Sequence, residues 1–293
     1  MSHHHAHDDA HDTARIDWDE LGPFLERGAE LQLPLYARAA AWIGEQLPAG
    51  AVRRVLDIGS GPGVITCLLA EAFPYAEVVA VDATPALLER ARARADRSGL
   101  GDRVRTHVAE LPSGMEEVGE ADLIWAGNSV HHLGDQRAAL TGLAQQLRTG
   151  GLLALFEGGL QPRHLPRDIG IGRPGLESRI DAAQAAWFDG MRTDLPDSKP
   201  EVEDWRALLH AAGLGATGTR SFLLDVPAPV TAAVREHLVH GFSWQRTALE
   251  GRLDADDVGV LDRLLDPNDP EGLMHRQDCY LLVARTVHTA RRG

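Results

Sequence analysis

The sequence has few cysteines and no long apolar run. Its 293 residues include only two cysteines, Cys67 and Cys279, which lie far apart and each within an apolar segment. This usage gives no support for a disulfide framework or a thiolate metal cluster, and it is typical of a reducing compartment. No segment approaches the roughly 20 consecutive apolar residues that a membrane-spanning helix requires. We therefore expect a cytoplasmic protein without a metal site.

Basic residues are also scarce. Lys199 is the only lysine, and 29 basic residues are set against 43 acidic ones, which gives a formal net charge of −14. Such a chain repels phosphate backbones, whereas nucleic-acid-binding proteins gather Lys and Arg on a basic face. We therefore expect a small-molecule partner and neither a nucleic acid nor a membrane. The oligomeric state stays open, and a homodimer is one of the possibilities.

The chain is predicted to form one elaborated domain. Its first twelve residues hold five of the fourteen histidines and resemble a disordered tail, whether native or a cloning remnant. The predicted division is a tail (1–12), an N-terminal helical cap (13–50), a core (51–158), a lid insertion (159–200), a core helix and strand (201–228), a second helical lid (229–270), and a closing strand with a tail (271–293).

Short apolar strands alternate with helical segments in the core. The first strand, ending at Ile58, enters a glycine-rich turn and then a helix from Val64. A later strand over Gly151–Glu157 is almost wholly apolar, as expected for a strand covered by helices on both faces. In the cap, apolar residues recur at helical spacing, and Pro34 predicts a break. The alternation predicts an α/β fold with a parallel sheet.

Three glycines follow the first strand. Gly59, Gly61 and Gly63 lack side chains, so the backbone can approach a ligand and turn sharply into a helix. Dinucleotide sites favour the spacing Gly-x-Gly-x-x-Gly, whereas these glycines alternate with other residues and follow an acidic residue, Asp57. The spacing therefore disfavours NAD.

Polar residues stand at the ends of the next strands. Asp82 ends the second strand, where a carboxylate can accept both hydroxyl hydrogens of a ribose. Glu110 follows the third strand, within reach of an adenine edge. Asn128, His131 and His132 follow the fourth strand and face the crevice where open parallel sheets bind ligands. These residues predict a site along the carboxyl edge of the sheet.

Together, Val55–Gly63, Val81–Asp82, Glu110–Pro112 and Asn128–Asp135 resemble class I S-adenosylmethionine-dependent methyltransferases. The resemblance implies a Rossmann-like seven-stranded sheet with an antiparallel last strand, and helical lid insertions. It also implies S-adenosylmethionine as methyl donor and S-adenosylhomocysteine as product. The pattern looks most like actinobacterial small-molecule methyltransferases of specialised metabolism, some of which modify indole or other aromatic scaffolds.

By this resemblance, the glycines line the methionine and ribose portions of the cofactor, and Ala109 with Glu110 frames the adenine. Position 110 holds Glu, whereas Asp is common there in the family. Tyr36 could approach the cofactor from the cap or simply pack in the core. The residues predicted to bind the cofactor are Tyr36, Asp57, Gly59, Gly61, Gly63, Asp82, Ala83, Ala109, Glu110 and Asn128.

Methyl transfer requires an aligned nucleophile and, where needed, a group that removes its proton. Histidine is suited to this role because its reference pKa is near 6.5. The candidates are His131, His132, His237 and His240. Either member of the first pair could instead brace its loop.

Aromatic residues in the two insertions favour a closed apolar pocket for a flat acceptor, although such stripes also build cores. Arg163 and His164, after the fifth strand, could orient a polar substrate. The residues predicted to contact the acceptor are Glu157, Trp187, Phe188, Met191, Trp244 and Arg246.

The sequence thus predicts a methyltransferase that acts on a nitrogen, oxygen or carbon atom of a small aromatic natural product. An indole is one such acceptor. One alternative is a non-catalytic, regulatory protein that binds the same cofactor. The other is a nicotinamide-dependent reductase. The loop spacing and the antiparallel closing strand disfavour the reductase, and the histidines near the crevice disfavour a silent binder.

Overall fold

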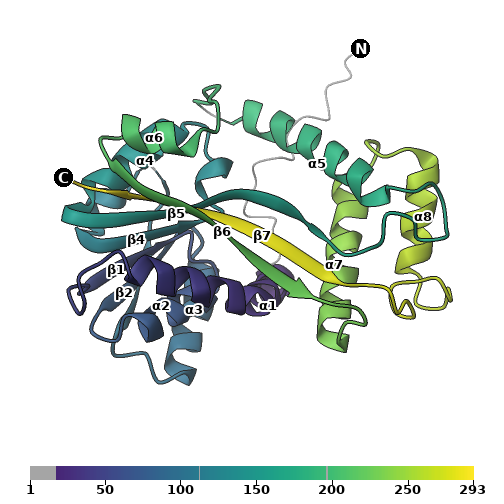
Figure 1. The fold of residues 1–293 in the computed structure, drawn as a ribbon, viewed down its shortest axis with the longest axis horizontal. Helices are drawn as coiled ribbons and strands as arrows, with labels where there is room; N and C mark the ends of the chain where they lie inside the picture. Colours follow the sequence, from purple (N-terminus) through teal and green to yellow (C-terminus); the bar gives the residue numbers. More distant parts are fainter. Residues whose placement is uncertain (1–17, 112, 196) are drawn as a thin grey trace, which may run out of the picture.

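The computed structural model describes residues 18–111, 113–195 and 197–293, so the predicted tail lies outside the described residues (Figure 1). Within these ranges seven strands form one sheet in the order β3-β2-β1-β4-β5-β7-β6. Strand β7 runs antiparallel to both of its neighbours, which confirms the predicted fold class. The strands are β1 (Arg54–Ile58), β2 (Glu77–Asp82), β3 (Val104–Val108), β4 (Ala121–Gly127), β5 (Leu147–Arg163), β6 (Gly215–Val226) and β7 (Leu281–Arg291).

Helices cover both faces of the sheet (Figure 1). Successive strand residues point to opposite faces, so Val55 packs in one apolar cluster and Leu56 in the other. The first cluster contains side chains of α1 (Trp18–Gly44), α2 (Val64–Ala72) and α3 (Pro85–Arg97). The second contains side chains of α4 (Gln136–Gln145) and α6 (Trp205–Ala211). No helix in the described ranges is long and apolar enough to cross a membrane.

The predicted break at Pro34 is wrong, because α1 continues through this residue as one helix of 27 residues. Proline removes one backbone donor, but Leu35, Ala39 and Ile43 on the following turns are completely buried. Burial of this apolar stripe outweighs the lost hydrogen bond.

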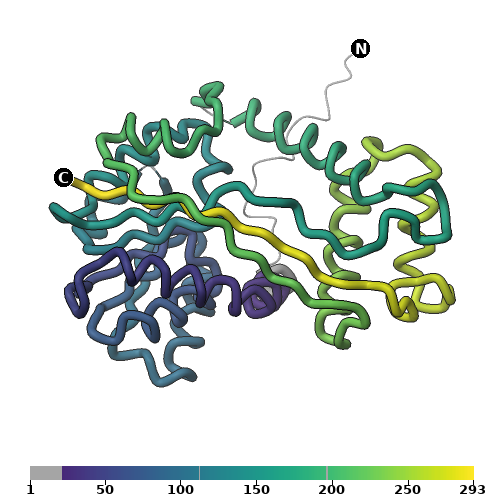
Figure 2. Tube along the Cα trace, in the orientation of Figure 1, coloured from purple at the N-terminus to yellow at the C-terminus, as the bar shows by residue number. Residues whose placement is uncertain are grey.

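Three strands are longer than the others and extend beyond them (Figures 1 and 2). Their extended ends carry α5 (Leu176–Thr193), α7 (Ala232–Ala248) and α8 (Ala255–Leu265), which we call the accessory helices. Strand β5 was predicted to end at Glu157, but it continues to Arg163 past an irregularity in its pairing with β7. Gly159 has φ of 118° there, and a Cβ atom would lie 2.2 Å from the carbonyl oxygen of Ala284.

Asp57 lies on β1 immediately before the glycine-rich turn. Its side chain is buried and accepts a 2.6 Å hydrogen bond from the hydroxyl of Thr66 on α2. Burial raises the pKa of Asp57 to about 7, and the neighbouring Asp82 adds to this rise, although the bond from Thr66 opposes it. The contact joins the end of β1 to the first turns of α2.

Leu123 and Leu223 allow a matched test of the core. Leu123 on β4 is completely buried, whereas Leu223 on the edge strand β6 is 48% exposed. Leu123→Ala should lower the free energy of unfolding by about 2–5 kcal/mol. Leu223→Ala should lower it by less than about 1 kcal/mol. Denaturant unfolding followed by circular dichroism measures both, and equal losses would contradict the placement of β4 in the centre.

Asp57 should make stability depend on pH. Its native pKa of about 7 lies above the ordinary Asp value of 3.8, so its stabilising contribution is complete below pH 4 and is lost as pH rises through 7. The gap between the two values corresponds to about 4 kcal/mol. Asp57→Asn removes this titration, so its free energy of unfolding should vary less between pH 4 and pH 8. Parallel profiles for the two proteins would contradict the raised pKa.

Candidate functional site

The glycine-rich turn joins β1 to α2 at the carboxyl edge of the sheet. Gly59, Gly61 and Gly63 all have positive φ, at 66°, 53° and 81°. A Cβ atom on Gly63 would lie 2.5 Å from the Cβ of Ala91, so this glycine allows α3 to pack closely against the turn. A Cβ atom on Gly61 would meet nothing within 4 Å. Gly63 therefore serves packing, whereas Gly61 borders open space.

Asp82 holds the tip of this turn. One oxygen of its carboxylate accepts a hydrogen bond from the backbone N–H of Gly61 and the other from that of Thr84, each at 2.9 Å. A carboxylate has about four acceptor sites, so two remain for a ligand. Its neighbour Ala83 is exposed.

Two hydroxyl groups near the turn are buried without a partner among the described residues. They belong to Ser60, within the turn, and to Ser129, after β4. Ser129 lies so close that a Cβ atom on Gly59 would be 2.8 Å from its own Cβ. Buried polar groups are normally paired, so these hydroxyls fit the binding of a polar ligand. The methionine part of S-adenosylmethionine is such a ligand.

The other predicted cofactor residues follow the same edge. The backbone N–H of Ala109 donates to the carbonyl of Asp82 at 3.1 Å, which brings the ends of β2 and β3 together. Glu110 is exposed, and so is Asn128, whose φ of 50° turns the chain sharply after β4. The backbone N–H of Asn128 donates to the carbonyl of Phe156.

His131 makes the closest polar contact of this edge. Its Nδ1 lies 2.6 Å from one carboxylate oxygen of Glu157, whose side chain is 2% exposed. The other oxygen accepts the backbone N–H groups of Val130 at 2.9 Å and His131 at 3.2 Å. Glu157 was predicted to contact the acceptor from the rim, but the structure places its carboxylate in the interior as the partner of His131.

His132 has a different environment. The residue is exposed, yet surrounding atoms desolvate its ring, and this effect, together with His131 and Arg192, lowers its pKa to about 4. His132 is therefore neutral at pH 7, and its exposure does not alter that conclusion. Phe188 of α5 lies across the pair, with its ring centroid 5.4 Å from each imidazole. An accessory helix thus reaches the histidines.

An aromatic cluster lies beneath these residues. Trp125 and Phe156 stack with ring centroids 4.0 Å apart, and the ring of Tyr36 lies 6.2 Å and 5.8 Å from them. Tyr36 is 6% exposed, so most of it packs in the core. Sequence reasoning missed the stack because it depends on the pairing of β4 with β5, which the sequence does not specify.

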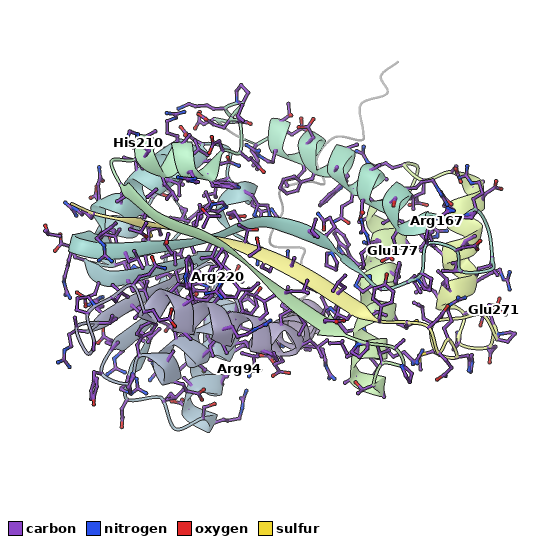
Figure 3. The ribbon with its side chains drawn as sticks, in the orientation of Figure 1. Arg94, Arg167, Glu177, His210, Arg220 and Glu271 are labelled. Atoms are coloured by element: carbon purple, nitrogen blue, oxygen red, sulfur yellow. The ribbon has the colours of Figure 1, made fainter. Side chains whose placement is uncertain are left out.

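A cavity of about 260 Å³ lies among the extended strands and the accessory helices. Figure 3 labels one of its lining residues, Glu177, on the first turn of α5. The cavity is bordered by β5 and its following loop, α5, α7 and β7. The lining residues are Gln161, Pro162, His164, Glu177, Ile180, Asp181, Gln184, His237, Leu238, Gly241, Phe242, Trp244, Gln245 and Arg285.

The structure separates the four candidate histidines into two pairs. His237 lines the cavity from α7, and burial lowers its pKa to about 4, with His164, His240 and Arg27 adding to the effect. His240 is exposed, and its Nδ1 lies 2.9 Å from the carbonyl of Glu236 on the same helix. Neither has an observed contact with the pair on the turn after β4.

The predicted acceptor residues are also divided. Trp187 meets Trp244 edge-on at 5.7 Å beside the cavity, whereas Met191 is half-buried one turn further along α5. Arg246 was predicted to bind substrate, but its side chain donates to Asp262 of α8 at 2.8 Å and does not line the cavity. Arginine is a suitable residue type for binding a polar substrate, but the position of Arg246 on α7 brings its side chain to Asp262 of α8 and not to the cavity.

Two residues at the end of β5 hold the wall of the cavity, Arg163 as the last of the strand and His164 directly after it. Arg163 pairs with Asp181 of α5 at 2.5 Å, and the Nδ1 of His164 lies 2.9 Å from Glu177. Glu177 also accepts the backbone N–H groups of His164 and Leu165. Across the described ranges, no group of three or more side chains is arranged to hold a metal ion.

The comparisons with known proteins agree with this geometry. Residues 55–151 match a family described as a methyltransferase domain. The chain is 33% identical over 210 residues to the trans-aconitate 2-methyltransferase of Methylobacterium radiotolerans, over 64% of this chain and 76% of that one. It is 30% identical over 232 residues to the protein of the same name from Methylobacterium nodulans, over 74% and 85% of the two chains.

Similarity in fold extends further than similarity in sequence. A crystal structure described as a methyltransferase from Bacillus halodurans C-125 matches 88% of this chain and 98% of its own, with a TM-score of 0.51 and 16% identity. The sheet closes with an antiparallel strand, as expected for this family. The domain match and the two Methylobacterium relatives show that the chain belongs to the same family as those methyltransferases. The chain belongs to the class I S-adenosylmethionine-dependent methyltransferases and is an enzyme that takes its methyl group from S-adenosylmethionine, releasing S-adenosylhomocysteine.

Proposed function

We propose that the enzyme methylates an oxygen or a nitrogen of a small aromatic molecule, with His131 as the base. The observation that carries this proposal is the 2.6 Å contact between Nδ1 of His131 and the buried carboxylate of Glu157. An ionised carboxylate only accepts hydrogen bonds, so Nδ1 carries the proton and Nε2 presents its lone pair. The ring is thereby oriented as a proton acceptor at the carboxyl edge of the sheet.

The cofactor supplies a methyl group that is already activated by its sulfonium, so the protein must align the acceptor and remove a proton. In this proposal His131 takes the proton from the acceptor through Nε2. Glu157 then offsets the positive charge of the imidazolium, and its bonds to the backbone keep the ring in place. Phe188 covers the histidine pair and limits the access of water.

The cofactor-binding proposal rests on the glycine turn and the neighbouring strand ends. Gly61 leaves open space, Asp82 keeps two acceptor sites for the ribose, and the hydroxyls of Ser60 and Ser129 have no other partner among the described residues. Ala109 and Glu110 would then flank the adenine, as the family resemblance implies.

An aromatic acceptor, such as an indole or a phenol of specialised metabolism, suits the surroundings of this base. Strand β5 and helix α5 both run from the histidine pair to the cavity. Gln161 lies four residues beyond Glu157, about 13 Å along an extended strand, and Gln184 lies one turn before Phe188, about 6 Å along the helix. Aromatic rings occupy this path at Trp187 and Trp244. A flat molecule could stack there while its reactive atom faces His131.

Asp82→Ala should weaken cofactor binding by about 1–3 kcal/mol, the usual range for loss of hydrogen bonds to a charged acceptor. Calorimetry with S-adenosylhomocysteine measures the change. Asp102→Ala removes a carboxylate from an exposed turn before β3 and serves as the matched control, with affinity expected to be unchanged. Unaltered affinity of the Asp82 variant would remove this residue from the ribose site.

His131→Ala should lower kcat by about 10²–10⁴-fold, the usual contribution of general base catalysis, and leave cofactor affinity nearly intact. Transfer of a labelled methyl group to a panel of phenols and indoles measures it. For a phenol, activity of the variant should recover partly as pH approaches 10, because the acceptor then ionises without a base.

Glu157→Gln tests the partner of the base, and it should lower kcat less severely than loss of the imidazole. Equal losses of cofactor affinity and turnover in the His131 variant, without recovery at high pH, would indicate that the residue only braces the turn. Cofactor binding without transfer to any member of the panel would instead favour the non-catalytic alternative.

A further inference from the structure

The cavity among the accessory helices is lined by one arginine and two carboxylates. Arg285 is the only lysine or arginine among its lining residues. Of the two lining carboxylates, Asp181 pairs with Arg163 outside the lining set, and Glu177 accepts bonds from His164 and Leu165. The negative groups of the wall are therefore already engaged.

Arg285 itself lacks an acidic partner in the described part of the chain. Its Nε donates to the side-chain oxygen of Gln32 at 3.3 Å, and no described residue binds its two terminal amino groups. Several arginines near the cavity are paired with carboxylates, as in Arg163–Asp181, Arg179–Asp257 and Arg246–Asp262. The half-buried guanidinium of Arg285 thus presents a free planar fork to the cavity, which matches a carboxylate in two parallel hydrogen bonds.

The strand register places Arg285 near the strand position of Glu157, the partner of the proposed base. Arg285 pairs with Gly159, two residues beyond Glu157 on β5. Two residues of an extended strand span at most about 7 Å, and the pairing is irregular here, so the backbone positions of Glu157 and Gly159 lie within the length of one aromatic ring with a short substituent. Gly159 lies tightly against β7 at this point, since a Cβ atom there would be 3.1 Å from the Cα of Arg285.

We propose that Arg285 binds a single carboxylate on the aromatic acceptor and thereby decides which atom of the acceptor faces His131. This inference rests on the proposed function, since it requires the acceptor to occupy the cavity. It identifies the substrate class as aromatic carboxylic acids whose nucleophilic atom is separate from the acid group. Gln32 holds the guanidinium in position through Nε.

Binding of matched probes tests the proposal without turnover. Benzoate, phenylacetate and indole-3-acetate are each compared with the corresponding uncharged amide by calorimetry, on the full chain saturated with S-adenosylhomocysteine. At least one acid should bind about 10- to 100-fold more tightly than its amide, as expected for hydrogen bonds between charged groups. Arg285→Gln should abolish this preference, and Arg285→Lys should retain only part of it because lysine lacks the fork.

Arg220→Gln is the control, since it removes the same charge from β6, away from the cavity lining (Figure 3). This variant should keep the preference for acids. The proposal is overturned if no acid binds more tightly than its amide, or if Arg285→Gln and Arg285→Lys both discriminate as the unaltered protein does. Methyl transfer to neutral aromatic acceptors alone would leave the proposed function standing and overturn this inference.

Discussion

The buried carboxylate of Glu157 on β5 holds His131 and the turn after β4 in place. It accepts hydrogen bonds from His131 and from two backbone N–H groups at the start of the turn after β4. An unpaired carboxylate at this depth would be costly, so the three donors and the carboxylate fix one another. The strand that carries Glu157 then continues past a pairing irregularity toward the accessory helices. Glu157 therefore connects His131, the proposed base, both to the sheet and, through β5, to the cavity wall.

The turn that we propose for the cofactor and the cavity that we propose for the acceptor, called here the cofactor side and the acceptor side, are built from different segments. The strand ends from β1 to β4 form the first, where Gly63 allows close packing against Ala91 and Asp82 holds the turn. The second is formed by the extended ends of β5 and β7 with helices α5 and α7. Strand β5 and helix α5 are the described elements with observed contributions to both the histidine pair and the cavity.

Much of the cofactor side follows from local sequence patterns. The apolar strands, the alternating glycines and Asp82 are close together in the chain, and each pattern has a direct physical reason. The boundaries that failed depend on distant contacts. Pro34 remains helical because the following turns are buried, and β5 passes Glu157 because β7 pairs with it beyond that point.

The acceptor side was harder to predict for the same reason. His131 and His237 are the same residue type near predicted crevices, and only the fold shows that one contacts Glu157 and the other lines the cavity. Arg246 and Arg285 illustrate the point equally well. The first lies on α7 and is paired with Asp262 of α8, whereas the second lies on β7 and reaches the cavity.

The family match covers the proposed cofactor side but not the cavity. The methyltransferase-domain match ends at residue 151, and every residue that lines the cavity comes after 160. Changes in the accessory helices can therefore alter the acceptor without disturbing the turn that serves the cofactor. Arg285 differs from those helices in one respect, because it stands on β7, between two strands of the central sheet. If Arg285 binds the acceptor as we propose, its rigid strand keeps its distance from His131 while the helices around it vary, so it sets the position of the acceptor more accurately than a residue on a lid.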